Sequence, residues 1–209
     1  MTARNHERRS RRPLIVLSLV LGLVVAACGG EEEYVPAGII RTPAPDVSGI
    51  LLPDVTNDRE VPAVGPEDGY LVLYFGFTFC PDVCPTTMSV LRRAMRDLGD
   101  DAERIDVAMI TVDPDRDTPE VLSAYVKAFA PDGFAVRTVD ADRLAAIAAP
   151  FGASYSVTVQ EDGWVDVVHT GFLYAIDDEG ILRLTWPFGI DSDSVHNDLR
   201  ALLKEYDDA

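Results

Sequence analysis

The sequence has little positive charge. Its 209 residues include 18 Lys and Arg against 35 Asp and Glu, which gives a formal net charge of −17. Nucleic-acid surfaces need clustered basic residues to neutralise phosphates, so this balance argues against nucleic-acid binding. Charged residues make up only 25% of the chain and hydrophobic residues 47%, and no internal repeat is visible. This composition excludes wholesale disorder, and the length predicts one ordinary domain plus an additional segment.

Long hydrophobic runs are also absent. The longest, residues 14–27, has 14 residues and is too short for a comfortable membrane span. Five arginines precede it, and it ends in Val25-Ala26-Ala27-Cys28, which resembles a bacterial lipobox. The pattern predicts a lipoprotein signal peptide at 1–27, cut before an acylated Cys28. The alternative is a plain N-terminal anchor with an incidental cysteine, and export by the Sec or the twin-arginine route stays open.

Removal of the signal peptide would make the chain more acidic. Residues 28–209 hold 13 basic and 34 acidic residues, for a formal charge of −21. Such a surface favours cationic partners, including metal ions, and disfavours contact with anionic lipid headgroups. Residues 28–45 are acidic and rich in proline, which predicts an extended tether between the lipid and a domain at 46–209.

Strand and helix patterns alternate along residues 46–209. Nearly continuous apolar runs at 70–77 and 105–112 are typical of buried strands. Shorter strands are predicted at 134–139, 154–160, 171–176 and 181–186. Apolar residues recur at helical spacing after residue 84, and Thr118, Asp140 and Asp191 are suited to cap three further helices. The order predicts an α/β domain of thioredoxin-like fold, with a central mixed sheet flanked by helices.

Two cysteines, Cys80 and Cys84, lie where the first predicted strand meets its helix. Four residues apart at a helix start, they share one face, so their sulfurs could converge on one metal ion or join in a disulfide. The helix N-terminus carries unpaired N–H groups and partial positive charge, which favour the thiolate and predict a low thiol pKa. The alternative is a purely stabilising disulfide of an exported protein, although such bridges usually join distant segments.

A soft metal held by two thiolates needs a third donor, and the chain has three histidines. His6 falls within the signal peptide, and His196 lies in the polar part of the last helix pattern, as a solvated surface residue would. His169 stands at the start of the buried strand predicted at 171–176, whose entry loop would face the cysteine loop in a thioredoxin-like sheet. Two thiolates and one imidazole suit Cu(I). The alternative is a hydrogen-bonded histidine at a strand end.

Three segments in this order resemble the Sco family (synthesis of cytochrome c oxidase), which are copper-binding proteins of thioredoxin fold. They are residues 73–87, LYFGFTFCPDVCPTT, residues 111–120, TVDPDRDTPE, and His169 before its strand. The resemblance covers about 46–206 and implies that Cys80, Cys84 and His169 bind copper. It makes Asp113 and Asp117, in the second segment, candidates for supporting these ligands. Relatives often carry Asp directly before this histidine, where this chain has Val168, with Asp166 two residues further back.

The resemblance implies a copper chaperone on the extracytoplasmic side of the cell membrane, anchored through the lipid on Cys28. The cofactor would be copper, as Cu(I) or Cu(II). The partners would be an upstream copper donor and the CuA-bearing subunit of cytochrome c oxidase. Two mechanisms stay open: copper transfer by ligand exchange, which makes the protein a metallochaperone rather than an enzyme, or reduction of the disulfide of the apo-oxidase subunit by Cys80 and Cys84 as a redox-active catalytic pair. Peroxidase activity ranks a distant third, because a peroxidatic cysteine would have different surroundings.

Overall fold

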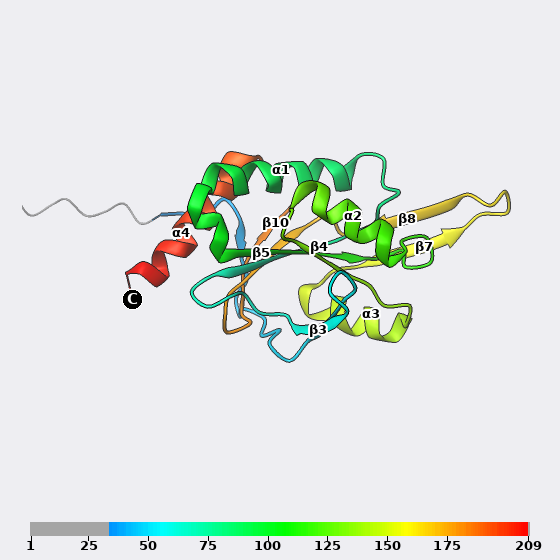
Figure 1. The fold of residues 1–209 in the computed structure, drawn as a ribbon, viewed down its shortest axis with the longest axis horizontal. Coiled ribbons are helices and arrows are strands. Elements are labelled where there is room, and N and C mark those ends of the chain that lie inside the picture. The colour runs from blue at the N-terminus through cyan, green and yellow to red at the C-terminus, as the bar shows by residue number, and fades with distance from the viewer. Residues whose placement is uncertain (1–33, 209) are drawn as a thin grey trace, which may run out of the picture. The chain divides into compact units, whose positions relative to one another are not determined.

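The computed structural model describes residues 34–208 (Figure 1). The signal peptide expected at 1–27 and the lipidation expected at Cys28 lie outside the described residues. Within residues 34–208, no helix is both long enough and apolar enough to cross a membrane.

An eight-stranded mixed sheet forms the centre of the domain, in the order β1-β10-β9-β4-β5-β6-β2-β3. Its strands are β1 (Ile39–Ile40), β2 (Leu51–Asp54), β3 (Arg59–Pro62), β4 (Tyr70–Gly76), β5 (Ile105–Thr111), β6 (Phe134–Val136), β9 (Leu173–Ile176) and β10 (Leu182–Trp186). The middle strand β4 pairs in parallel with β5 and antiparallel with β9. Two further strands, β7 (Tyr155–Val159) and β8 (Val165–His169), form a separate antiparallel hairpin, which extends away from the sheet in Figure 1.

Helices cover both faces of the sheet. They are α1 (Val83–Leu98), α2 (Pro119–Phe129), α3 (Ala141–Ala148) and α4 (Ser192–Asp207), with short 3-10 turns at Gly99–Arg104 and Ala149–Phe151. Figure 1 shows α1 and α2 above the sheet and α3 below it, and α4 packs against α1. The side chains of Thr118, Asp140 and Asp191 each accept a backbone N–H at the start of a helix, as the sequence predicts. The predicted fold class is therefore confirmed.

Strand β4 is the most deeply enclosed part of the domain. All seven of its residues are buried, because it has strands on both sides and helices over both faces. The ring of Phe75, in β4, packs edge to face against the rings of both Phe151 and Tyr174. The strand ends at Gly76, and the cysteine loop follows directly.

The domain begins before residue 46, within the segment expected to be tether. The backbone N–H groups of Ala37 and Gly38 donate to the carboxylate of Asp198 in α4, and Trp186 Nε1 donates to the same carboxylate at 2.7 Å. Asp198 is fully buried, and a buried carboxylate needs such donors. With residues 37–38 fixed in this way, β1 adds to the sheet beside β10.

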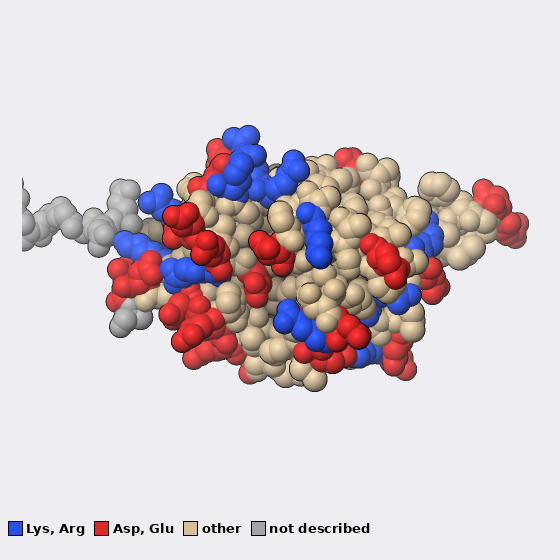
Figure 2. All heavy atoms as spheres, in the orientation of Figure 1, with Lys and Arg blue, Asp and Glu red and all other residues tan. Residues whose placement is uncertain are grey.

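Charges are unevenly spread over the face shown in Figure 2. Acidic side chains form separate patches over this face, one of them at the tip of the β7–β8 hairpin, where Glu161 and Asp162 lie. Basic side chains gather over α1, which carries Arg92, Arg93 and Arg96. The mainly acidic surface fits the expectation of cationic partners.

Candidate metal centre

Cys80 and Cys84 lie in and just after the loop that joins β4 to α1. Helix α1 begins at Val83, which places Cys84 in its first turn. The backbone N–H of Cys84 donates to Cys80 Sγ at 3.3 Å, so the loop folds one sulfur back over the helix start. The two thiols are not joined in a disulfide; Cys84 is fully buried and Cys80 half-buried. The helical spacing therefore brings the two sulfurs to one place.

Gly76 allows the helix start to approach the end of β4. A Cβ atom at this position would lie 3.1 Å from Cys84 Sγ and 2.5 Å from Tyr74 Cε1. Real Cβ atoms do not come so close to a ring carbon, so any side chain here would displace the ring or the sulfur. The lack of a side chain at Gly76 therefore lets Cys84 pack directly against the end of β4.

His169 reaches the cysteines from the hairpin. It is the last residue of β8, paired in register with Tyr155, and not the first residue of the buried strand as the sequence suggested. The reason is that residues 165–169 pair with β7 as an independent hairpin, and the buried strand β9 starts only at Leu173. The predicted neighbourhood is nevertheless confirmed: β9 pairs with β4, and His169 Nε2 lies 3.4 Å from Cys84 Sγ.

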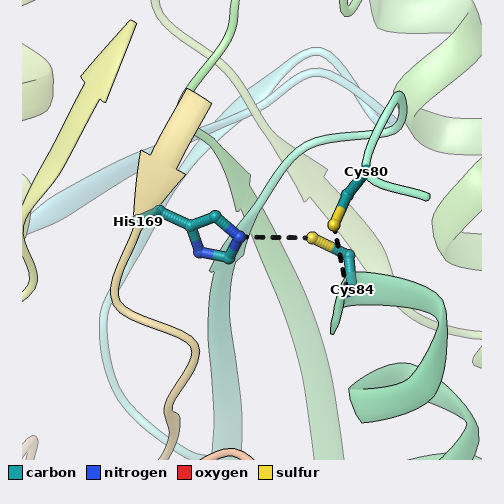
Figure 3. Close-up of side chains that lie close together, drawn as sticks. All are labelled: Cys80, Cys84 and His169. Atoms are coloured by element: carbon teal, nitrogen blue, oxygen red, sulfur yellow. Dashed lines mark hydrogen bonds between the residues drawn. The ribbon is translucent and has the colours of Figure 1, made fainter. Parts of the chain in front are cut away.

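The three side chains converge on one point (Figure 3). One ligand atom from each of Cys80, Cys84 and His169 lies within 4.8 Å of the other two. His169 Nδ1 is 3.2 Å from the carbonyl oxygen of Thr170. A proton on Nδ1 satisfies that carbonyl and leaves the Nε2 lone pair directed at the cysteines, which is the arrangement typical of a metal-binding imidazole. The rings of Tyr74 and Phe77 pack edge-on against the imidazole at 6.0 and 5.7 Å.

Burial sets the protonation of the site. It raises the pKa of the Cys84 thiol to about 12, so the low pKa expected from the helix N-terminus is wrong for this cysteine. The thiol is fully enclosed, and the cost of placing a charge there exceeds the stabilisation from the helix end. Burial also lowers the pKa of His169, which favours the neutral, ligating imidazole. In the metal-free state the site thus holds a protonated Cys84 beside a neutral His169.

Asp117 hydrogen-bonds to the cysteine loop, whereas Asp113 pairs with Arg116 of its own loop. The buried carboxylate of Asp117 accepts the backbone N–H of Thr78, the Thr78 hydroxyl at 2.5 Å and the Thr111 hydroxyl at 2.6 Å. Asp113, also buried, forms an ion pair with Arg116. The loop between β5 and α2 therefore holds the residues that precede Cys80.

Other residues differ from the sequence-based interpretation or were not found by it. Asp166 is exposed, and strand alternation places it on the opposite face of β8 from His169. His196 is half-buried, with its Nδ1 enclosed, and not solvated as expected. The contacts of Thr78 and Arg116 were missed, because only their position within the two family-like segments marks them.

Comparisons with known proteins agree with this geometry. The family model described as SCO1/SenC matches residues 55–204, well over half of the chain. A Stutzerimonas stutzeri protein named for copper binding is 30% identical over 83% of this chain and 85% of its own length. The SCO2-like protein RP587 of Rickettsia prowazekii is 36% identical, but the match spans only 52% of this chain and 54% of that protein.

Solved structures are similar over most of the chain. Apo Sco1 from Thermus thermophilus has a TM-score of 0.71 and 32% identity, covering 82% of this chain and 99% of that one. Yeast Sco1 with copper bound has a TM-score of 0.67 and 25% identity, covering 78% of this chain and 91% of that one.

Proposed function

The chain belongs to the SCO1/SenC family, and we propose that it is an extracytoplasmic copper chaperone that delivers copper to the CuA centre of cytochrome c oxidase. Copper is the cargo, and Cys80, Cys84 and His169 are the residues that hold it. The observation that carries the proposal is their convergence, with one ligand atom from each within 4.8 Å of the others. Two sulfurs and one imidazole nitrogen form a soft donor set, which suits Cu(I) better than a hard cation.

The unequal burial of the two cysteines suits transfer by ligand exchange. Cys84 is fully enclosed, whereas Cys80 is half-buried and reaches the surface. An incoming thiolate or imidazole from a partner can therefore approach on the Cys80 side, while Cys84 and His169 still hold the cargo. The high pKa of Cys84, about 12, also means that release of copper is favoured when this sulfur regains its proton.

The proposed partners follow from this role. An upstream donor supplies copper, and the CuA-bearing oxidase subunit receives it. The lipid on Cys28 holds the domain at the extracytoplasmic face of the membrane. Mass spectrometry of the native protein tests this anchoring: we expect an acylated N-terminal cysteine and loss of residues 1–27, whereas a mature protein that retains residues 14–27 would rule the anchor out.

A second candidate function is reduction of the oxidase subunit's cysteines by the same thiols. Two features favour it: the thiols are free, and the Cys84 N–H donates to Cys80 Sγ at 3.3 Å, which keeps the more exposed sulfur beside Cys84. In that reaction Cys80 would attack the partner disulfide, and Cys84 would then displace the partner to leave a Cys80–Cys84 disulfide. Copper is not required for either step.

His169 separates the two functions, because thiol exchange needs no third metal ligand. We expect His169→Ala to lower copper affinity by at least about tenfold, the least that loss of an outer hydrogen-bond partner of a metal ligand usually costs. Oxidase assembly in cells should then fail, although the cysteines still cycle between thiol and disulfide. His196→Ala, which changes the histidine of α4, is the control and should leave both properties intact.

Thiol reactivity must be measured on the same variant across pH, because a charged imidazole would also affect the cysteines. Normal oxidase assembly in cells that carry His169→Ala, together with lost copper binding, would overturn copper delivery in favour of thiol reduction.

A further inference from the structure

Arg116, in the loop between β5 and α2, contacts two aromatic rings of the cysteine loop. Its guanidinium carbon lies 4.9 Å from the centre of the Phe79 ring and 5.9 Å from that of Phe77. Its Nε donates to the buried carboxylate of Asp113 at 2.5 Å, which fixes the plane of the guanidinium. Its Nη2 is enclosed and has no hydrogen-bond partner among residues 34–208. The ring faces therefore provide the main remaining contact for this cation.

Within residues 34–208, the Phe79 ring has a cation–π contact with Arg116 and no other ring contact. Asp117 holds Thr78 on one side, and the Cys80 N–H donates to the carbonyl of Phe77 at 3.3 Å. The Phe79 side chain lies between these two points and remains 56% exposed. Burial holds a ring with this exposure only in part, so its contact with Arg116 helps to fix where it rests. Since Phe79 directly precedes Cys80, its position also affects the backbone that carries the exposed sulfur.

We propose that Arg116 is a positioning residue of the metal centre: held by Asp113, it clamps Phe79 beside Cys80, fixes Cys80 and restricts access to its sulfur. As far as copper is concerned, this inference rests on the proposed function. The clamp slows release of copper and slows the attack of Cys80 on small reagents. It makes Phe79 a cover for the more open of the two sulfurs, while Cys84 is protected by burial in the core.

The chemistry of arginine is specific to this role. A planar guanidinium can lie over a ring and at the same time donate from Nε to a carboxylate at its edge. A lysine ammonium can pair with Asp113 but cannot also stack flat on Phe79. Arg116→Lys should therefore keep the ion pair and lose most of the clamp, which distinguishes stacking from charge.

The test is a double-variant cycle on the full chain, purified in the reduced, copper-free state. Arg116→Met, Phe79→Ala and the combination are compared by the rate at which iodoacetamide modifies Cys80, followed by mass spectrometry, with Cys84 as the internal reference. We expect each single change to speed Cys80 modification about threefold to tenfold, the range given by a cation–π contact of about 1 kcal/mol. The double variant should be no faster than Phe79→Ala.

A matched control comes from α1 and α2. Arg92 lies 5.8 Å over the ring of Phe129, in a similar cation–π contact away from the cysteines. Arg92→Met should leave Cys80 reactivity unchanged. A second readout is the copper-loaded protein: release of copper to a chelator should accelerate in Arg116→Met and Arg116→Lys, and the Cu(II)–thiolate absorption should broaden or shift.

The outcomes separate this inference from the proposed function. Unchanged Cys80 modification in Arg116→Met, or effects of the two single changes that multiply in the double variant, would overturn the clamp. If Arg116→Lys shows the same rate of Cys80 modification as the wild type, stacking is not the basis of the clamp. If Arg116→Met fails to fold, Arg116→Lys and Phe79→Ala carry the same comparison. A wild-type protein that binds no copper would overturn the proposed function, while the modification rates would still support or overturn the clamp.

Discussion

Cys84 and His169 lie 3.4 Å apart at Sγ and Nε2, yet the structure holds them in opposite ways. Cys84 is enclosed at the start of α1, behind a strand whose seven residues are all buried. His169 ends a two-stranded hairpin in which every residue is at least partly exposed. The candidate metal centre thus joins a core-built half, which carries the sulfurs, to a surface-built half, which carries the imidazole.

Hydrogen bonds tie the surface-built half together at its base, beside His169. An isolated two-stranded hairpin is marginally stable in water. Next to His169, however, the backbone N–H of Thr170 donates to the carbonyl of Ser154 at 2.9 Å, and the Ser154 N–H donates to the Thr170 hydroxyl at 3.0 Å. These bonds close the hairpin beside His169. The end of β8 is therefore fixed by hydrogen bonds, although the strand itself is not buried.

The largest expected effect is in the core-built half. Cys84→Ser replaces the enclosed sulfur by a hydroxyl, a poor ligand for a soft metal. Loss of an outer hydrogen-bond partner of a metal ligand costs about 10–100-fold in affinity. We expect Cys84→Ser to lower copper affinity by much more than this. Competition with a chelator of known Cu(I) affinity measures it, with Ser89→Ala, on the exposed side of α1, as control. Near-native affinity in Cys84→Ser would show that the core half does not provide the main ligand.

Stability should differ sharply between the two halves. Leu73 in β4 is fully buried, and Leu73→Ala should lower the free energy of unfolding by about 2–5 kcal/mol. Val159 near the hairpin tip is 69% exposed, and Val159→Ala should change it by no more than about 0.5 kcal/mol. Urea denaturation of both variants tests the contrast. Similar losses in both would mean that the hairpin packs on something in solution.

Copper affinity should rise with pH, because copper must displace the proton on Cys84 in the core-built half. Burial holds the Cys84 pKa at about 12 in the metal-free protein, so copper must displace this proton throughout the neutral range. Each pH unit between about 7 and 9 should therefore raise the affinity by about tenfold for this one proton. The lowered pKa of His169 keeps the imidazole neutral there, so its contribution appears only in acid. Titrations at several pH values measure the slope; a flat profile would contradict a protonated Cys84.

The smallest expected effect concerns the base of the hairpin. Tyr155 pairs in register with His169, and Tyr155→Ala removes a cross-strand contact worth about 0.2–1 kcal/mol. We expect copper affinity to fall by no more than about fivefold, measured by the same chelator competition. Val157→Ala, two pairs further from the base, is the control and should have no effect. A loss in Tyr155→Ala as large as that in Cys84→Ser would mean that the surface-built half dominates the site.

Features that depend on neighbours along the chain can be predicted from the sequence alone. Periodicity and capping residues predict the buried strands and the helices that begin after Thr118, Asp140 and Asp191. The spacing of Cys80 and Cys84 predicts two sulfurs on one face, because a helical turn fixes that relation whatever surrounds it. The family-like segments then identify His169 as the third member, which the structure places beside them.

Features that depend on burial and on contacts between distant segments follow from the folded structure and not from local patterns. His169 ends a hairpin strand, because pairing with β7 and not local pattern sets its element. The Cys84 pKa is raised and not lowered, because enclosure by β4 and its neighbours outweighs the helix N-terminus. Arg116 meets Phe79 only because the β5–α2 loop folds over the cysteine loop. Such contacts join residues tens of positions apart, so no local pattern in the chain encodes them.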